Sequence, residues 1–323
     1  MRPLISKPTK ILLLLVFTLA ACNLPSAPGP SDALPATLDS PANESAASAP
    51  ASPPASSTTV NEIASEEPAP ESTQPVQESS PPFQVILSEG PITLITLGDS
   101  LTEGAGDDER GIGYPGRLIE MLQALRPGST VFNFGISGWN SDYLINGGDG
   151  LPSQLEQGLV EARRAQGAGE PALALVWIGS NDLWYLYEYG PDPITAEAES
   201  FDLDNYTSNL THIITELQNA GAVVLIGLND DQSLRPFLTN PPGEPVLPYT
   251  TADDLQRMSL QVQAYNEVIL ALAAQFGAGV VDFYNTDIFT NPETVYEDGI
   301  HPNPHGYDLI AEIWLEAIRK ILP

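Results

Sequence analysis

The feature that most constrains the fold of this chain is a series of short apolar runs that alternate with helical patterns from residue 83 onward. Each run is rich in β-branched residues and is continuous, which is typical of strands buried on both faces. The five predicted strands are Ile92–Leu97, Thr130–Phe134, Ala172–Ile178, Ala222–Leu228 and Val280–Phe283. Strands that alternate with helices form parallel sheets, so we predict an α/β domain of three layers, α/β/α, with a five-stranded parallel sheet.

Helical periodicity fills the intervals between these runs. The predicted helices are Tyr114–Leu125, Leu151–Gln166, Asn205–Ala220, Asp253–Phe276 and Pro304–Leu322. Thr251 and Asp254 have the spacing of a capping box before the fourth helix, and Gly277 is the residue type that ends a helix in the left-handed conformation. Residues Phe83–Leu87 are open to two interpretations, a sixth strand at the sheet edge or the end of the preceding segment.

The segment from Asn23 to Pro82 differs from the rest of the chain in composition. It is dominated by Pro, Ser, Ala and Glu, contains no Lys or Arg, and has almost no large apolar residues. Such a segment buries too little surface to offset its ordering entropy, so we expect a disordered, extended tether over residues 22–82. A proline-rich binding motif is the alternative, although the prolines have no regular spacing.

The first 21 residues have the layout of a secretory signal, with three basic residues before the uncharged run Ile11–Ala21. This run is shorter than the roughly 20 apolar residues of a membrane span, although an anchor helix remains the alternative. Residues Leu19–Cys22 resemble the lipobox of bacterial lipoproteins, which implies acylation of Cys22 as the new N-terminus. We therefore expect an extracytoplasmic lipoprotein, at the cell surface or in the periplasm, whose only membrane contact is its lipid.

Charge and length limit the remaining function classes. The formal net charge of −30 repels phosphate backbones and anionic membrane surfaces, so we do not expect a nucleic-acid partner. Cys22 is the only cysteine, which excludes an intramolecular disulfide. Without the signal at 1–21 and the tether at 22–82, residues 83–323 are enough for one well-buried domain.

Residues suited to acyl transfer follow several of the predicted strands. Ser100 comes directly after the first strand, Ser137 and Gly138 after the second, and Gly179–Asp182 after the third. The carboxyl ends of parallel strands meet at one sheet edge, so these residues are expected to converge there. A serine, a histidine and a carboxylate would supply the nucleophile, the base and the orienting group of acyl transfer.

The choice of base is narrow because the chain has three histidines. His301 follows the fifth strand and has Asp298 three residues upstream, whereas the other two have no such partner. His212 lies inside a helical pattern and His305 begins another, so we interpret both as structural.

Four short blocks of the domain contain these residues, in the order Gly98–Gly104, Asn133–Gly138, Gly179–Asp182 and Asp298–Pro302. In this order, they resemble the signature blocks of the SGNH, or GDSL-type, serine hydrolases. The resemblance implies a flavodoxin-like domain and a serine esterase that forms an acyl-enzyme and hydrolyses it with water. The implied substrates are ester-bearing small molecules, lipids or acylated carbohydrates.

Carried over residue by residue, the resemblance makes Ser100 the nucleophile, His301 the general base and acid, and Asp298 the group that orients the imidazole. It assigns the oxyanion hole to the backbone amides of Ser100 and Gly138 and the side-chain amide of Asn181. The structural alternatives are a helix cap for Ser100 and ordinary turns for the other residues. Alternatives in function are acyl transfer to a carbohydrate acceptor by the same triad, or a surface lipoprotein that binds a ligand without turnover.

Further polar and aromatic residues near these blocks have more than one interpretation. Asp99 and Asp182 are predicted to be structural acceptors that brace loops. Residues Asn229–Thr250 form either part of the substrate pocket or a surface excursion. A group of aromatic residues after Asn181 either lines a pocket for an acyl or sugar group or packs beneath the loop; it consists of Trp184, Tyr185, Tyr187 and Tyr189.

No pattern in the sequence indicates a cofactor or a metal. Three scattered histidines and one cysteine do not form a typical zinc set, and no glycine-rich dinucleotide motif begins a helix. Residues Asp107–Glu109 lack the alternating spacing of calcium ligands, so we predict a solvated loop there.

Overall fold

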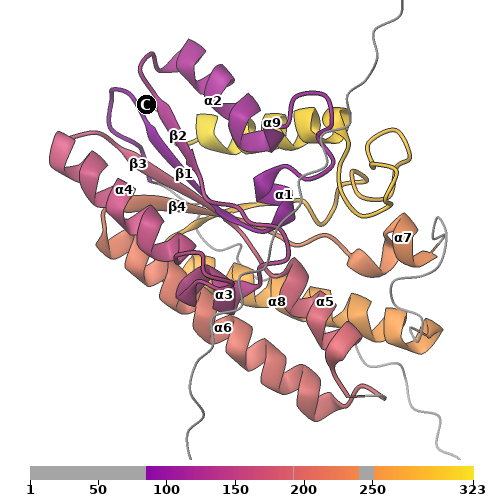
Figure 1. Ribbon diagram of the computed structural model, residues 1–323. Helices are drawn as coiled ribbons and strands as arrows, with labels where there is room; N and C mark the ends of the chain where they lie inside the picture. Colours follow the sequence, from indigo (N-terminus) through magenta and orange to yellow (C-terminus); the bar gives the residue numbers. More distant parts are fainter. Residues whose placement is uncertain (1–84, 192, 240–250) are drawn as a thin grey trace, which may run out of the picture. The chain divides into compact units, whose positions relative to one another are not determined.

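The computed structural model of the chain describes residues 85–191, 193–239 and 251–323 (Figure 1). The predictions for residues 1–82, which include the signal, Cys22 and the tether, lie outside the described residues. Within the three described ranges, no helix combines the length and the apolar character needed to cross a bilayer.

Five parallel strands form one sheet in the order β2-β1-β3-β4-β5. Their bounds are β1 Thr93–Gly98, β2 Thr130–Asn133, β3 Ala172–Trp177, β4 Ala222–Gly227 and β5 Gly279–Val281. All five predicted strands and the three-layer α/β/α fold class are confirmed. Strand β5 ends two residues early because the Asp282 carboxylate accepts a hydrogen bond from the Asn285 amide at 3.0 Å and begins a turn.

Helices cover both faces of the sheet (Figure 1). Their bounds are α2 Gly113–Leu125 and α9 Pro304–Arg319 on one face, and α4 Gln154–Ala168, α6 Ala196–Asn219 and α8 Ala252–Phe276 on the other. Successive side chains of β3 alternate between the two cores: Leu175 and Trp177 lie in the α2/α9 core, and Ala174 and Val176 in the other. This period of two positions the strand between two apolar layers.

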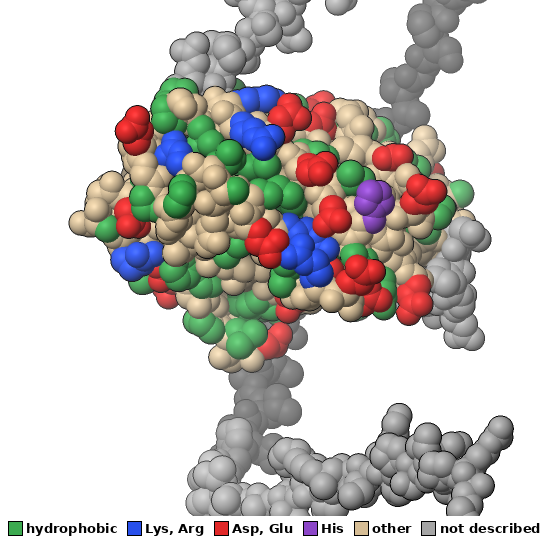
Figure 2. Space-filling model, turned by 90° about the horizontal axis from the view of Figure 1, so that it is seen from above, with side chains coloured by type: hydrophobic (Ala, Val, Ile, Leu, Met, Phe, Trp, Pro, Cys, Tyr) green, Lys and Arg blue, Asp and Glu red, His purple; other side chains and the backbone are tan. Residues whose placement is uncertain are grey.

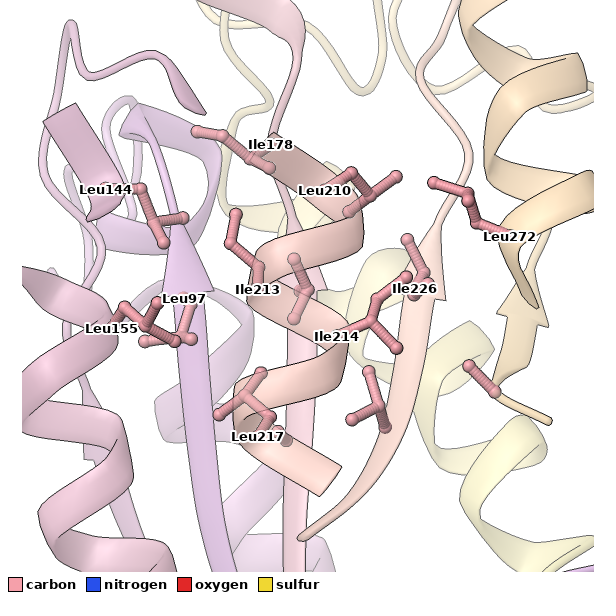
Figure 3. Close-up of a cluster of buried hydrophobic side chains, with 14 of the residues drawn as sticks. Leu97, Leu144, Leu155, Ile178, Leu210, Ile213, Ile214, Leu217, Ile226 and Leu272 are labelled. Carbon is pink, nitrogen blue, oxygen red and sulfur yellow. The ribbon is translucent and has the colours of Figure 1, made fainter. Parts of the chain in front are cut away.

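Both cores are closely packed with large side chains. Leu210, Ile213 and Leu217 of α6 lie along the sheet in the first core (Figure 3). In the second core, Trp177 stacks on Phe283 with ring centroids 4.1 Å apart. Burial of apolar area at about 25 cal/mol per Å² makes these two layers the main source of stability.

Helix boundaries follow local capping. The capping box of Thr251 and Asp254 and the left-handed Gly277 (φ 65°) delimit α8 as predicted. Helix α6 begins nine residues before the predicted Asn205, where the Thr195 side chain caps it. Its first turns are largely polar, and they lack the apolar periodicity on which the prediction depended.

Four short helices and one 3₁₀ turn were not predicted from the sequence. They are α1 Ser100–Glu103, α3 Ser141–Asn146, α5 Ser180–Tyr189, η1 Gln232–Leu234 and α7 Pro236–Thr239. Residues 85–87, the described part of the open sixth-strand interpretation, form no strand. Leu87 is nevertheless buried, and its amide donates to the Ile321 carbonyl at 2.8 Å.

The solvated loop predicted for residues 107–109 is wrong for Asp107. Its carboxylate is buried and pairs with the Arg117 guanidinium, with Nη1 at 2.6 Å. It also accepts hydrogen bonds from the amides of Ile112 and Gly113, each at 3.0 Å. Asp107 therefore anchors the start of α2. The prediction failed because it did not consider Arg117, which lies one helical turn after Gly113 and pairs with this carboxylate.

The surface of the domain carries charges of both signs on the face that is seen when the molecule of Figure 1 is viewed from above. Acidic and basic side chains are interspersed there with hydrophobic ones (Figure 2). This face therefore carries no uniform patch of one sign.

Candidate active site

Ser100 is held at the carboxyl end of β1 by the residues on either side of it. A Cβ atom on Gly98 would lie 2.3 Å from both the Thr102 Oγ1 atom and the Trp177 carbonyl oxygen, so the position requires glycine. Asp99 caps α1 by accepting a hydrogen bond from the Leu101 amide at 2.9 Å. Ser100 is therefore the first residue of a helix that begins where the strand ends.

His301 lies in a loop that its own neighbours fold. The Oδ1 atom of Asp298 accepts hydrogen bonds from the amides of Ile300 and His301 at 2.8 and 3.0 Å. Gly299 has φ +72°, and a Cβ atom there would meet the Phe237 amide nitrogen at 2.7 Å. The Asp-Gly-Ile-His segment is thus a tight turn that presents one carboxylate oxygen and one imidazole to each other.

Ser100, His301 and Asp298 form a continuous hydrogen-bonded row. The Nε2 atom of His301 lies 2.9 Å from the Ser100 hydroxyl, and its Nδ1 atom lies 2.7 Å from the Oδ2 atom of Asp298. Ser100 and His301 are 201 positions apart in the sequence, so the fold and not local sequence brings them together.

The charge on Asp298 determines which imidazole nitrogen carries the proton. Partial burial would raise the pKa of Asp298, but hydrogen bonds from the His301 side chain and from the amides of His301 and Ile300 outweigh it and hold the pKa below its ordinary value. An ionised carboxylate only accepts, so Nδ1 carries the proton and donates it to Asp298. The Nε2 lone pair is then available to accept the proton of the Ser100 hydroxyl.

A pocket of about 230 Å³ opens onto this row. Gly138 and Asn181 line it together with Ser100 and His301, so the structure brings all predicted oxyanion residues to one cavity. The Asn181 Nδ2 atom donates one hydrogen to the Trp139 carbonyl at 2.9 Å, and its second hydrogen is available to a ligand. Across the described ranges, the amides of Ser100 and Gly138 have no protein acceptor.

Tyr185 supports the Gly138 loop in a way that the sequence analysis missed. Its hydroxyl donates to the Gly138 carbonyl at 2.5 Å, while Asn181 holds the next carbonyl, that of Trp139. Asn181 and Tyr185 are four residues apart on α5 and therefore lie on one helix face. The sequence already named Asn181 and Tyr185 as candidates, and their spacing of four residues was the signal that could have placed both beside the Gly138 loop.

Arg235 is a second pocket residue that the sequence analysis missed. It is buried, and its guanidinium makes a two-pronged pair with Asp230 at 2.6 and 2.8 Å. Arg235 and Gln232 both line the pocket, so the described part of the long loop contributes two residues to the site. The remainder of that loop, 240–250, lies outside the described residues.

The other polar candidates have structural roles. Asp182 accepts hydrogen bonds from the Ser141 amide and hydroxyl at 3.0 and 2.5 Å, which confirms it, like Asp99, as an acceptor that braces a loop. Burial raises the pKa of Asp99 to about 6 and that of Asp182 to about 7. The amide of Ser137 donates to the Glu103 carboxylate.

The remaining histidines lie away from the row. His212 and His305 are exposed on α6 and α9. The described part of the chain holds no group of three or more His, Cys, Asp or Glu side chains arranged to bind a metal ion.

Comparison with known proteins adds a family and several relatives. The family model described as GDSL-like Lipase/Acylhydrolase matches residues 96–309. The uncharacterized protein YpmR of Bacillus subtilis (strain 168) is 27% identical over 237 residues, covering 71% of this chain and 82% of that protein.

Two solved structures are among those similar to this chain. Axe2, an acetylxylan esterase from Geobacillus stearothermophilus, is 22% identical with a TM-score of 0.46, over 72% of this chain and 95% of that chain. The psychrotrophic esterase EstA from Pseudoalteromonas sp. is 19% identical with a TM-score of 0.45, over 71% of this chain and 97% of that chain.

Proposed function

This chain belongs to the GDSL-like lipase/acylhydrolase family, and from that premise we propose that it is a serine esterase that hydrolyses carboxylic esters through an acyl-enzyme on Ser100. The observation that carries the proposal is the hydrogen-bonded row from Ser100 through His301 to Asp298. This row supplies a nucleophile, a base with a free Nε2 lone pair and a carboxylate that fixes the imidazole.

In the first half of the reaction, the Ser100 Oγ atom attacks the ester carbonyl carbon while its proton moves to Nε2 of His301. The tetrahedral intermediate collapses when the bond to the alcohol oxygen breaks and the imidazolium returns its proton to that oxygen. The products are the free alcohol and an ester between the acyl group and Ser100. Asp298 stays ionised throughout and stabilises the imidazolium.

In the second half, water attacks the acyl-enzyme carbonyl and gives its proton to Nε2 of His301. The new intermediate expels the Ser100 oxygen, which takes the proton back from the imidazolium, and the carboxylic acid leaves. Each intermediate carries an oxyanion that the amides of Ser100 and Gly138 and the Asn181 side chain are positioned to stabilise. One such donor typically contributes about 2.7 to 4 kcal/mol to lowering the barrier.

The size of the catalytic pocket supports a short acyl group. Its volume of about 230 Å³ is at the small end for a ligand site, and Trp184 and Ile300 form part of its wall. A short-chain ester such as 4-nitrophenyl acetate is therefore the first substrate to test.

The Ser100→Ala variant tests the proposal. We expect its hydrolysis of 4-nitrophenyl acetate to fall at least about 10⁴-fold, because the alanine has no nucleophile for the imidazole to activate. Ser208→Ala, the same substitution at an exposed position on α6, is the matched control and keeps wild-type kcat/KM. Retention of most of the activity in Ser100→Ala, with unchanged circular dichroism, would refute the assignment.

We further propose that the protein is an extracytoplasmic lipoprotein attached to a bacterial membrane by lipid on Cys22. The support is the signal-like N-terminus, the lipobox-like Leu19–Cys22 and the tether-like composition of residues 23–82. We expect Cys22→Ala to move the protein from the detergent fraction to the aqueous fraction on phase separation. Continued partition of that variant into detergent would contradict the lipid anchor.

A further inference from the structure

A second cavity adjoins the catalytic pocket and plays no part in the chemistry proposed above. It has a volume of about 600 Å³ and lies between α3 and α5. Ser137 and Gly138 line both cavities, so this space lies next to the pocket that holds the Ser100 hydroxyl. We call this second cavity the aromatic groove.

Aromatic rings make up much of the groove wall. Trp139 and Tyr143 contribute one pair with ring centroids 6.0 Å apart, and Tyr185 and Tyr189 another at 5.6 Å. Tyr143 is 40% exposed and Tyr189 is 72% exposed, so both rings present surface that a ligand can contact. Exposed rings in a concave surface are suited to ligands that present flat C–H faces.

The polar residues of the groove accept hydrogen bonds and repel anions. Asp142 and Asp149 lie among the rings, and no Lys or Arg is part of the described lining. Asp149 has φ 52° and Gly150 has φ 80°, and Gly148 and Leu151 exchange backbone hydrogen bonds of 3.2 and 2.8 Å on either side of them, so a tight Asp-Gly turn places Asp149 in the groove lining. A neutral ligand with many hydroxyl groups fits this combination better than an anionic lipid headgroup.

We propose that the aromatic groove binds the saccharide part of an uncharged, O-acylated oligosaccharide whose acyl group enters the catalytic pocket. The proposal rests on the esterase function proposed above, and it names the class of alcohol released. Pyranose rings present C–H groups to aromatic faces and hydroxyl groups to carboxylates. The two cavities thus divide the substrate, with the small one for the acyl group and the large one for the sugar.

The test measures binding without turnover, using the full-length protein and unacylated sugars. Isothermal titration calorimetry is performed with xylotetraose, cellotetraose and N-acetylchitotetraose as neutral probes, and with the cationic glucosamine tetramer for comparison. We expect at least one neutral probe to bind, and Tyr189→Ala to weaken that binding about 10-fold through loss of a stacking surface. Phe201→Ala is the matched control, since Phe201 is 69% exposed on α6 and outside the groove lining.

A second readout uses turnover of the O-acetylated form of the neutral sugar that binds. We expect Tyr189→Ala to lower kcat/KM for this ester about 10-fold more than it lowers kcat/KM for 4-nitrophenyl acetate. Absence of binding by every neutral probe, or equal effects of Tyr189→Ala on both esters, would overturn the proposal. Tighter binding of the glucosamine tetramer than of its neutral N-acetyl counterpart would also overturn it, because rings beside carboxylates attract cations.

The two proposals fail in different ways. If 4-nitrophenyl acetate is hydrolysed but no neutral sugar binds, the groove proposal alone is wrong. If a neutral sugar binds and Tyr189→Ala weakens it, yet no ester is hydrolysed, the esterase proposal is the one that fails.

Discussion

At the residue scale, the site depends on Asp298, whose two carboxylate oxygens have different roles. The Oδ1 atom of Asp298 folds the turn by accepting two backbone amides, and its Oδ2 atom accepts the imidazole proton. The same contacts that shape the loop therefore keep the carboxylate ionised. In the neutral imidazole this arrangement places the proton on Nδ1 and the lone pair on Nε2, beside Ser100.

The Asp298→Asn variant tests the role of the Asp298 carboxylate in fixing the imidazole proton on Nδ1. The asparagine amide can donate toward Nδ1, which favours the tautomer with the proton on Nε2 and removes the base from the Ser100 hydroxyl. We expect kcat for 4-nitrophenyl acetate to fall by about 10⁴-fold with little change in fold. Asp253→Asn, at an exposed position of α8, is the control that keeps wild-type kcat. A loss below 10-fold in Asp298→Asn would contradict the role of the carboxylate.

Some residues of the site were readable from the sequence and others were not. Ser100, His301 and Asp298 were candidates because each follows a predicted strand of the sheet and because a serine, a histidine and an aspartate together supply the groups that acyl transfer needs. Arg235 was missed because its partner Asp230 and its place beside the pocket are set by tertiary packing. Tyr185 was named only as one of several aromatics, since sequence does not specify the carbonyl to which a hydroxyl donates.

At the scale of elements, long strands and helices were predicted well and short helices were not. Strand β1 was predicted from the continuous apolar, β-branched run Ile92–Leu97, whereas α1 has four residues and is specified by the Asp99 cap. Helix periodicity needs several turns to show, and α3 and α7 do not provide them. The short helices nevertheless surround the site, because they fill the loops that follow the strands.

The junction of β1 and α1 yields a prediction about glycine. Gly98→Ala would place a methyl group 2.3 Å from the Trp177 carbonyl and from Thr102 Oγ1, so strand or helix must shift. We expect a loss of about 1 to 3 kcal/mol in the free energy of unfolding, together with lower kcat. Urea unfolding measures the first effect.

The control for that variant is Gly167→Ala in α4, where an added Cβ atom meets nothing within 4 Å. Because this glycine lies within a helix, the same substitution is expected to raise the free energy of unfolding by about 0.5 to 1 kcal/mol. Equal effects at the two positions would show that crowding at Gly98 does not hold the nucleophile in place.

At the scale of the whole molecule, folding raises the pKa of three carboxyl groups that lose contact with water. Burial raises the pKa of Asp182 to about 7, and those of Asp99 and Asp202 to about 6. The ordinary pKa of an aspartate carboxyl is 3.8, so between about pH 4 and pH 7 the native state binds more protons than the unfolded chain. The stability that these groups contribute is therefore present below pH 4 and is lost as the pH rises toward 7.

The Asp182→Asn variant isolates one of these groups. Asparagine keeps an acceptor for the Ser141 amide but does not titrate, so we expect a flatter dependence of unfolding free energy on pH between 5 and 7. The wild-type slope from one such group is at most about 1.4 kcal/mol per pH unit. Asp204→Asn, exposed on α6, should leave the wild-type slope intact, and an unchanged slope in Asp182→Asn would contradict this account.

The central claim, that Ser100 becomes covalently acylated, is tested most directly by mass spectrometry after treatment with a fluorophosphonate. This reagent mimics the tetrahedral intermediate and reacts with an activated serine hydroxyl. We expect one adduct per chain, located on the peptide that contains Ser100, with esterase activity lost in proportion to labelling. An unlabelled Ser100 in a fully inactivated protein, or full activity in a protein labelled at Ser100, would contradict the claim.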